Sequence, residues 1–210
     1  SYAYEALVRW FHPGPGAVPP TVFIPVAEKI GLINALGEWV LKTACAEAAS
    51  WATPLKVSVN VSPIQLMNTS LTDTIIEVLH QTGLDPRRLA LEITESDVFN
   101  ENTRSLEILS QLRELGIQIS IDDFGTGYSS LSRLSYFPFD KIKIDRSFVI
   151  NIPEQKDDLD IVRLIISMGK SLHMRIVAEG VETEEQLASL QALGCDLVQG
   201  YLIGKPSPLR

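Results

Sequence analysis

The stretch Ser120-Ile121-Asp122-Asp123-Phe124-Gly125-Thr126-Gly127-Tyr128-Ser129-Ser130 places two adjacent carboxylates directly after an apolar, β-branched run that begins at Ile117. Adjacent acids at the end of a strand repel each other unless a positive group lies beside them. A divalent cation is the usual partner, because hard cations prefer oxygen ligands. An ordinary Asx-type turn after a strand is the alternative interpretation. The residues at the other strand ends decide between the two.

Length and composition are those of an ordinary globular protein. The 210 residues are enough for one large domain, with 45% hydrophobic and 21% charged residues. A net charge of −8 argues against binding DNA through a broad basic surface, but it is compatible with a small anionic ligand held by metals. No apolar run has the length of a membrane span, and Cys45 and Cys195 have no metal-ligand spacing. We expect a cytoplasmic domain without membrane contact of its own, whatever anchor a longer protein carries.

Strand and helix patterns alternate along the whole chain. Strands are expected over residues 4–10, 56–61, 89–95, 117–123, 140–145, 175–179 and 197–202. Helical patterns are expected in pieces over 21–51, interrupted at Gly31 and Gly37, and over 63–82, 102–115, 130–135, 155–172 and 183–193. This alternation, without a linker, predicts one α/β domain over residues 1–210 with a parallel sheet.

Seven strands are one fewer than a closed (β/α)8 barrel contains. We therefore expect a TIM-like (β/α)8 barrel whose first strand precedes residue 1 or is missing from this chain, which makes the domain N-terminally incomplete. A doubly wound open sheet is the alternative.

Polar residues recur at the carboxyl ends of the expected strands, where the catalytic residues of parallel barrels lie. In chain order they are Glu5, which is set back from the end of its strand, Asn60, Glu92, Asp122 with Asp123, Lys143, Glu179 and Gln199. Buried charge is costly unless it is paired or bound to metal, and so many structural ion pairs in register would be unusual. The first five side chains of this series, from Glu5 to Asp123, offer only oxygen ligands, which suits Mg²⁺ or Mn²⁺.

A pair of such ions suits in-line displacement at phosphorus. Lys143 is placed to hold the attacking water or to neutralise a phosphate oxygen, and Glu179 to accept the proton of the water. Arg9 lies four residues after Glu5, so in a strand it points to the same side, where its guanidinium suits a phosphate. The residues alone predict a metal-dependent phosphoester hydrolase and do not name its substrate.

An ordered set of short motifs resembles the EAL domain, the bacterial cyclic-di-GMP phosphodiesterase. The set begins with Glu5-Ala6-Leu7-Val8-Arg9-Trp10 and ends at Lys205-Pro206. Between them lie Asn60-Val61-Ser62, Glu92-Ile93-Thr94-Glu95, the stretch from Asp122 to Ser130, Lys143-Ile144-Asp145, Glu179-Gly180-Val181-Glu182 and Gln199-Gly200-Tyr201. Any one of these tripeptides is weakly specific, but the ordered set covers nearly the whole chain.

The resemblance implies a TIM-like barrel that hydrolyses cyclic-di-GMP to linear pGpG with two Mg²⁺ or Mn²⁺ ions. The positions that match the metal ligands of the family are Glu5, Asn60, Glu92, Asp122 and Asp123. Lys143 and Glu179 match the pair around the nucleophilic water, with Glu179 as the base. Glu182 and Gln199 match residues that line the metal–water site, Glu182 among the catalytic residues and Gln199 among those that bind substrate.

Two further residues and several partners follow from the same resemblance. Arg9 matches a contact with a substrate phosphate, and Glu95 matches the residue that steadies the loop 124–130. In the family this loop couples metal binding to a homodimer interface. Family members are commonly fused to sensor or diguanylate-cyclase domains, and we expect the same of the full-length protein.

Many members of the family have lost catalysis and only bind the ligand. Every motif position named above carries a competent residue, so an active enzyme is favoured over a catalytically inactive cyclic-di-GMP receptor. A hydrolase of other phosphodiesters is a third hypothesis. Asp122→Asn is expected to abolish turnover and, by relieving repulsion between the two acids, to leave the fold intact or firmer.

Overall fold

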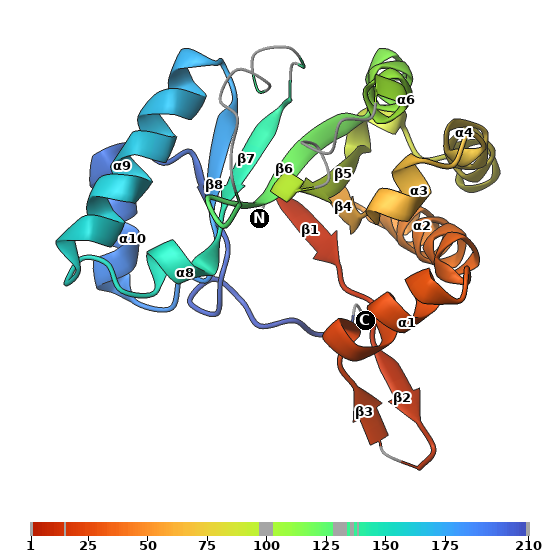
Figure 1. Cartoon of the computed structure of the whole chain (residues 1–210), viewed down its shortest axis with the longest axis horizontal. Coiled ribbons are helices and arrows are strands. Elements are labelled where there is room, and N and C mark those ends of the chain that lie inside the picture. Colours follow the sequence, from red (N-terminus) through yellow and green to blue (C-terminus); the bar gives the residue numbers. More distant parts are fainter. Residues whose placement is uncertain are drawn as a thin grey trace. The chain divides into compact units, whose positions relative to one another are not determined.

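Parallel strands and helices alternate along the chain in a computed structural model that describes residues 2–14, 16–96, 103–127, 134, 137 and 139–208 (Figure 1). The chain divides into two units. Unit 1 contains residues 1–93 and 102–118, and unit 2 contains residues 94–101 and 119–210.

Three parallel strands form the sheet of unit 1, in the order β1-β4-β5. They are β1 (Ala3–Ala6), β4 (Lys56–Asn60) and β5 (Leu89–Thr94). In register, Glu5 lies opposite Ser58 and Asn60 lies opposite Glu92. This register brings the polar ends of the three strands to one edge of the sheet.

The helices of unit 1 pack on one another and on β4. They are α1 (Pro20–Lys29), α2 (Ile33–Ser50), α3 (Pro63–Leu66), α4 (Leu71–Thr82), the 3-10 helix η1 (Pro86–Arg88) and α6 (Thr103–Glu114). Helix α2 packs on β4 and α4, and α4 packs on α6. Fully buried side chains such as Leu41, Ile75 and Leu91 form the core between strands and helices, and each contributes roughly 1.5–3 kcal/mol through burial.

Two glycines of the first helical region behave differently. The expected interruption at Gly31 is confirmed, since Gly31 separates α1 from α2 with a φ of 77°. The expected interruption at Gly37 is wrong, because Gly37 lies inside α2. An added Cβ there would lie 1.9 Å from Nε2 of Gln65, so this glycine is needed for close approach to α3 and not for a turn.

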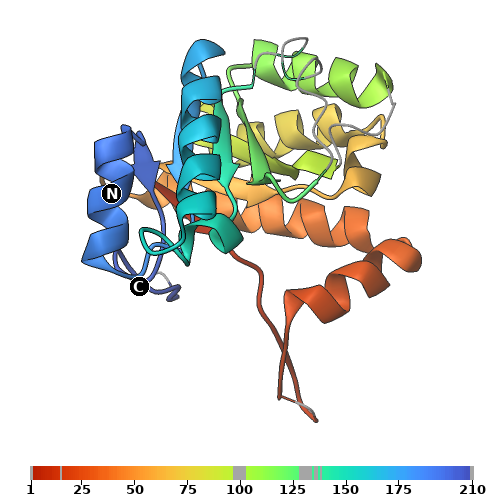
Figure 2. The same ribbon diagram turned by 60° about the vertical axis from the view of Figure 1, so that its left-hand side comes forward.

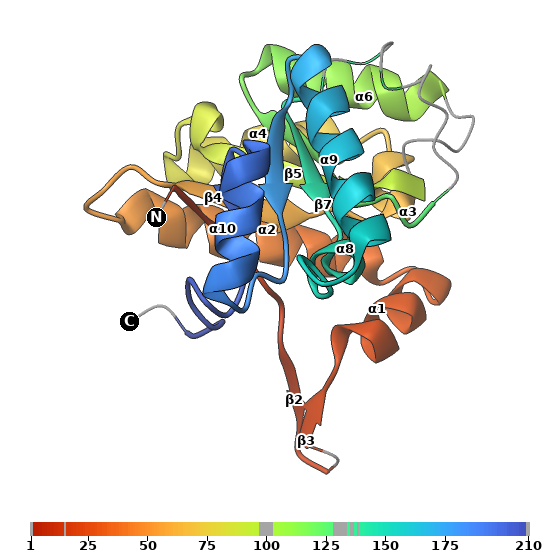
Figure 3. The same cartoon turned by 90° about the vertical axis from the view of Figure 1, so that its left-hand side faces the viewer.

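Two other expectations about unit 1 are corrected. The expected strand over residues 4–10 ends at Ala6, and an antiparallel hairpin follows, with β2 (Trp10–His12) and β3 (Gly16–Val18). The hairpin extends away from the rest of unit 1 (Figures 1 and 3), and the Trp10 ring packs edge-on against Phe23 of α1. The expected single helix over 63–82 is two helices, α3 and α4, joined by residues 67–70.

Four parallel strands form the sheet of unit 2, in the order β6-β7-β8-β9. They are β6 (Gln118–Phe124), β7 (Lys141–Ile144), β8 (Arg175–Ala178) and β9 (Leu197–Val198). With those of unit 1, they correspond to the seven expected strands, but the last, expected over residues 197–202, ends at Val198, and residues 201–203 form a turn. The core of this unit is formed by buried β-branched side chains, among them Ile121, Ile142, Ile144 and Ile176.

The helices of unit 2 are α8 (Arg146–Val149), α9 (Lys156–Ser171) and α10 (Glu184–Leu193). Helix α9 packs on β7 and β8, and α10 lies beside it (Figures 2 and 3). The capping box that opens α10, Thr183 with Gln186, is present as expected. Apart from Leu134, the expected helical piece around 130–135 lies outside the described residues. Within the described ranges, no helix combines the length and the apolar character that crossing a membrane requires.

Candidate metal and catalytic site at the strand ends

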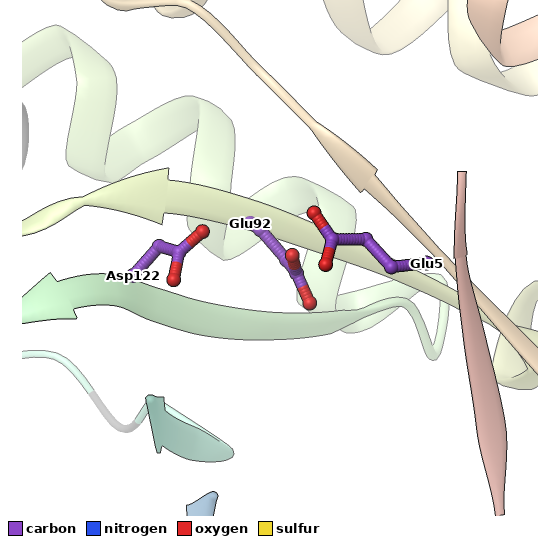
Figure 4. Close-up of side chains that lie close together, drawn as sticks. All are labelled: Glu5, Glu92 and Asp122. Carbon is purple, nitrogen blue, oxygen red and sulfur yellow. The ribbon is translucent and has the colours of Figure 1, made fainter. Parts of the chain in front are cut away.

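Three polar side chains come together at the strand ends of unit 1. Nδ2 of Asn60, the last residue of β4, donates a hydrogen bond of 2.8 Å to Oε1 of Glu5 on β1. A carboxylate oxygen of Glu5 and one of Glu92 on β5 lie within 4.8 Å of each other. Glu92 is only 4% exposed. Figure 4 draws Glu5 and Glu92 on their strands, with Asp122 of β6 as the third labelled side chain.

A second cluster occupies the strand ends of unit 2. Nζ of Lys143, which is 2% exposed on β7, lies 3.1 Å from Oδ1 of Asp122 and 2.7 Å from Oε1 of Glu179. Carboxylate oxygens of Asp122, Asp123 and Glu179 lie within 4.8 Å of one another. The cluster thus brings three carboxylate groups together, and the Lys143 ammonium group contacts two of them, Asp122 and Glu179. The oxygen donors of the cluster therefore fit a hard metal cation.

The two adjacent acids reach the same cluster because β6 is irregular. In a regular strand, neighbouring side chains point to opposite faces of the sheet. Here the pairing register of β6 with β7 shifts between Ile121 and Phe124, and Asp123 has a φ of 53°. A bulge of this kind re-aims one side chain. Burial, followed by the charge of Asp122, raises the pKa of the Asp123 carboxyl group.

Glu95 holds the start of the loop that follows β6. The Gly125 backbone N–H donates to Oε2 of Glu95 at 2.7 Å, and Glu95 is 1% exposed. Gly125 has a φ of 102°, and an added Cβ there would lie 2.7 Å from the Phe148 ring of α8. Residues 124–127 of this loop are described, whereas Tyr128 to Ser130 lie outside the described residues.

Glu182 and Gln199 lie in the segments that follow β8 and β9. A carboxylate oxygen of Glu182 accepts a hydrogen bond of 2.9 Å from Nη2 of Arg146. The Gln199 N–H donates to the Ala178 carbonyl at 2.8 Å, and the Gln199 carbonyl accepts from the Val181 N–H at 3.0 Å. These backbone bonds keep Gln199 next to the segment that carries Glu179.

The inference that placed Arg9 on the face of Glu5 is wrong in its geometry. Strand β1 ends at Ala6, so strand alternation does not extend to residue 9. The Arg9 side chain is exposed, and its Nη1 donates to the Val8 carbonyl at 2.9 Å. A phosphate contact by Arg9 stays a prediction.

Arg146 was missed by the sequence reasoning, although it touches Glu182. A basic residue three positions after Lys143, just beyond the end of a strand, was the available signal. Its contact with the segment after β8 depends on tertiary structure, which a linear motif does not contain.

Alternating parallel strands and helices with oxygen-donor clusters at the strand ends define an α/β protein of the kind that places its chemistry at that edge. The sequence matches the family model of the EAL domain over residues 1–206, and the chain belongs to this family. Its fold is accordingly the TIM-like (β/α)8 fold of the EAL domain, as expected from the sequence, and not a doubly wound open sheet.

Two curated relatives come from Pseudomonas aeruginosa. The bifunctional diguanylate cyclase/cyclic di-GMP phosphodiesterase MucR is 45% identical over 208 residues, 97% of this chain and 30% of MucR. The cyclic di-GMP phosphodiesterase NbdA is 46% identical over 209 residues, 98% of this chain and 27% of NbdA. The chain thus spans less than a third of the length of either relative.

Among solved structures, the chain resembles the PaMucR phosphodiesterase in complex with c-di-GMP. The TM-score is 0.93 at 45% identity, and the match covers 97% of this chain and 84% of that one.

Proposed function

We propose that this chain is a metal-dependent phosphodiesterase that hydrolyses cyclic-di-GMP to linear pGpG. The observation that carries the proposal is the pairing of a buried lysine, Lys143, with both Asp122 and Glu179 at the strand ends of unit 2. Support comes from the family, from two relatives named as cyclic di-GMP phosphodiesterases, and from the similarity to a c-di-GMP complex.

The proposed metal ligands are the oxygen donors at the strand ends. They are Glu5, Asn60 and Glu92 of unit 1 and Asp122 and Asp123 of unit 2. Carboxylate and amide oxygens are typical ligands of Mg²⁺ and Mn²⁺. Two such ions, when bound, supply Lewis-acid chemistry that stabilises the charge developing in an in-line displacement at phosphorus.

The protein's own residues have separate roles in the proposed reaction. Glu179 accepts a proton from the attacking water, and the ion pair with Lys143 fixes the orientation of its carboxylate. A bond forms between the water oxygen and phosphorus as the bond from phosphorus to the 3′ oxygen breaks, and a proton ends on that oxygen. Glu182 and Gln199 line the site, and Arg9 contacts a phosphate of the substrate.

We also propose that the chain works within a longer protein and forms a homodimer through the loop 124–130. The fraction of MucR and NbdA that it matches supports the first proposal. The anchoring of Gly125 by Glu95 supports a loop held in one conformation at its start. Sedimentation of the isolated chain at several concentrations tests the dimer.

The experiment that tests the activity is incubation of the chain with cyclic-di-GMP and Mg²⁺ or Mn²⁺, followed by chromatography. We expect pGpG with metal and none with EDTA. Asp122→Asn should abolish turnover, and Asp157→Asn, which changes an exposed acid of α9, should not. Binding of the ligand without turnover in either metal would contradict the proposal and support the receptor alternative. Turnover of other cyclic or linear phosphodiesters instead would support a hydrolase of different specificity.

A further inference from the structure

Arg146 is the first residue of α8, the short helix that follows the strand carrying Lys143. Its guanidinium group forms an ion pair of 2.9 Å with Glu182, and both side chains are partly exposed, at 52% and 36%. Exposed ion pairs contribute only about 0–1 kcal/mol to stability. The contact therefore contributes little to folding, and its effect lies in where it places Glu182.

The aliphatic part of Arg146 makes a second contact with the same segment. An added Cβ at Gly180 would lie 2.2 Å from Cγ and 2.8 Å from Cβ of Arg146, so the arginine stem lies directly against this backbone. Gly180 has a φ of 69°, a conformation that glycine adopts without strain. Gly180 immediately follows Glu179, so Arg146 packs on the backbone next to the proposed base.

Other contacts hold both ends of the segment Glu179–Glu182. Lys143 holds the Glu179 carboxylate at 2.7 Å. Gln186 accepts from the Glu182 N–H at 2.7 Å and donates to the Ile150 carbonyl, at the end of α8, at 3.2 Å. The segment is thus tied to β7 at its start and to α8 at its end. Arg146 contacts the segment both in the middle, at Gly180, and at the end, at Glu182.

We propose that Arg146 is a positioning residue, which fixes the segment Glu179–Glu182 through its ion pair with Glu182 and its packing on Gly180. The inference rests on the proposed function for its effect on rate. The structural part of the inference, that Arg146 orders this segment, does not depend on the proposed function. Positioning contacts of this kind around a metal or catalytic site typically change activity about 10- to 100-fold when they are removed.

Arg146→Met tests the proposal, because it keeps the aliphatic stem and removes the charge. We expect kcat for cyclic-di-GMP to fall about 10-fold or more with KM changed less than about threefold, since an interaction that orients catalytic groups acts mainly on kcat. Arg146→Lys should restore part of the loss. Arg163→Met is the matched control, because Arg163 forms an exposed ion pair with Asp160 on α9, and it should leave kcat unchanged.

A double-mutant cycle shows whether Arg146 acts through Glu182. The loss in Arg146→Met/Glu182→Gln should be no greater than in Glu182→Gln alone, because residues that share one interaction are not additive. The proposal would be overturned if the fold-loss of kcat in the double variant equalled the product of the two single losses, or if Arg146→Met left kcat unchanged.

Hydrogen exchange separates this inference from the proposed activity. The Val181, Glu182 and Thr183 N–H groups are hydrogen-bonded, to the Gln199 carbonyl and to Gln186. Arg146→Met should speed exchange in a peptide covering 179–183 severalfold, and Arg163→Met should not. If the parent chain shows no turnover, the proposed function fails while exchange still decides the inference. Unchanged exchange in Arg146→Met would then overturn it.

Discussion

The two adjacent acids of β6 have different surroundings. Asp122 lies 3.1 Å from the ammonium group of buried Lys143, whereas burial and the charge of Asp122 raise the pKa of Asp123. The repulsion expected from the sequence is therefore relieved at Asp122 by a lysine and persists at Asp123. For Asp122→Asn we expected a fold that is intact or firmer; the Lys143 contact now favours an intact fold there, and we expect the stabilisation from removing one charge of Asp123→Asn.

Asp123→Asn should raise the unfolding temperature of the metal-free chain. The gain in the free energy of unfolding should stay below about 1 kcal/mol, because the side chain is partly exposed and its charge is screened. For a chain of this size, that gain raises the unfolding temperature by at most about 4 °C. Thermal unfolding in EDTA measures it. Asp122→Asn should not be stabilised, since it removes a carboxylate that lies 3.1 Å from the Lys143 ammonium group. Greater stabilisation in Asp122→Asn than in Asp123→Asn would contradict this account.

Cys45 lies fully buried in α2, and burial raises the pKa of its thiol to about 11. The folded state therefore favours the neutral thiol. The resulting stability is present in full below pH 9, the ordinary value, and is lost as the pH rises through about 11. We expect Cys45 to resist alkylation at pH 8 in the native chain and to react in urea. Cys45→Ala should reduce the loss of stability above pH 9, and rapid labelling of native Cys45 would contradict the prediction.

At the scale of elements, the sequence predicts the strands β4, β6, β7 and β8 well, because each is a short run that contains β-branched residues. The Thr183 capping box likewise depends only on neighbouring residues. The failures have long-range causes. The sequence predicts that Gly37 interrupts a helix, because glycine is a poor helix former. In the structure Gly37 lies inside α2 and faces Gln65 of α3, a contact that the sequence does not reveal. The hairpin after β1 contains turn residues that give no alternating apolar pattern.

Gly37→Ala tests the close approach of α2 and α3. Alanine favours the helix by up to about 1 kcal/mol, but its Cβ would meet Gln65, whose side chain is 4% exposed and accepts from the Ser62 N–H. We expect a net loss of about 1–3 kcal/mol in urea unfolding. Gly37→Ala/Gln65→Ala should be no less stable than Gln65→Ala alone, because the clash is gone. A stabilised Gly37→Ala variant would contradict this account.

The candidate site could be predicted only in part. The strand-end positions of Asn60, Glu92 and Asp122 follow from the period of the strands, and the structure places them there. The contribution of Asp123 depends on a bulge, and the ion pairs of Lys143 and Arg146 depend on which strands become neighbours. The inference that Arg9 points to the same side as Glu5 was wrong, because β1 ends at Ala6 and does not continue to residue 10 as the apolar residues suggested.

At the scale of the whole molecule, removing metal should abolish activity without unfolding the chain. Structural zinc sites behave differently, because their free energy of binding is needed for folding. Here the buried apolar cores of both units and the Lys143 ion pairs are formed by the protein alone. We expect a folded circular dichroism spectrum in EDTA and a higher unfolding temperature on adding Mg²⁺ or Mn²⁺, as for any ligand of the native state. An unfolded spectrum in EDTA would contradict this.

Lys143 gives the acidic cluster of unit 2 a counter-ion that cannot diffuse away. A shortage of divalent ions would therefore stop the proposed reaction but leave the polypeptide folded and resistant to proteolysis. A cell that regained its metal supply would recover activity from molecules already made, without waiting for new synthesis.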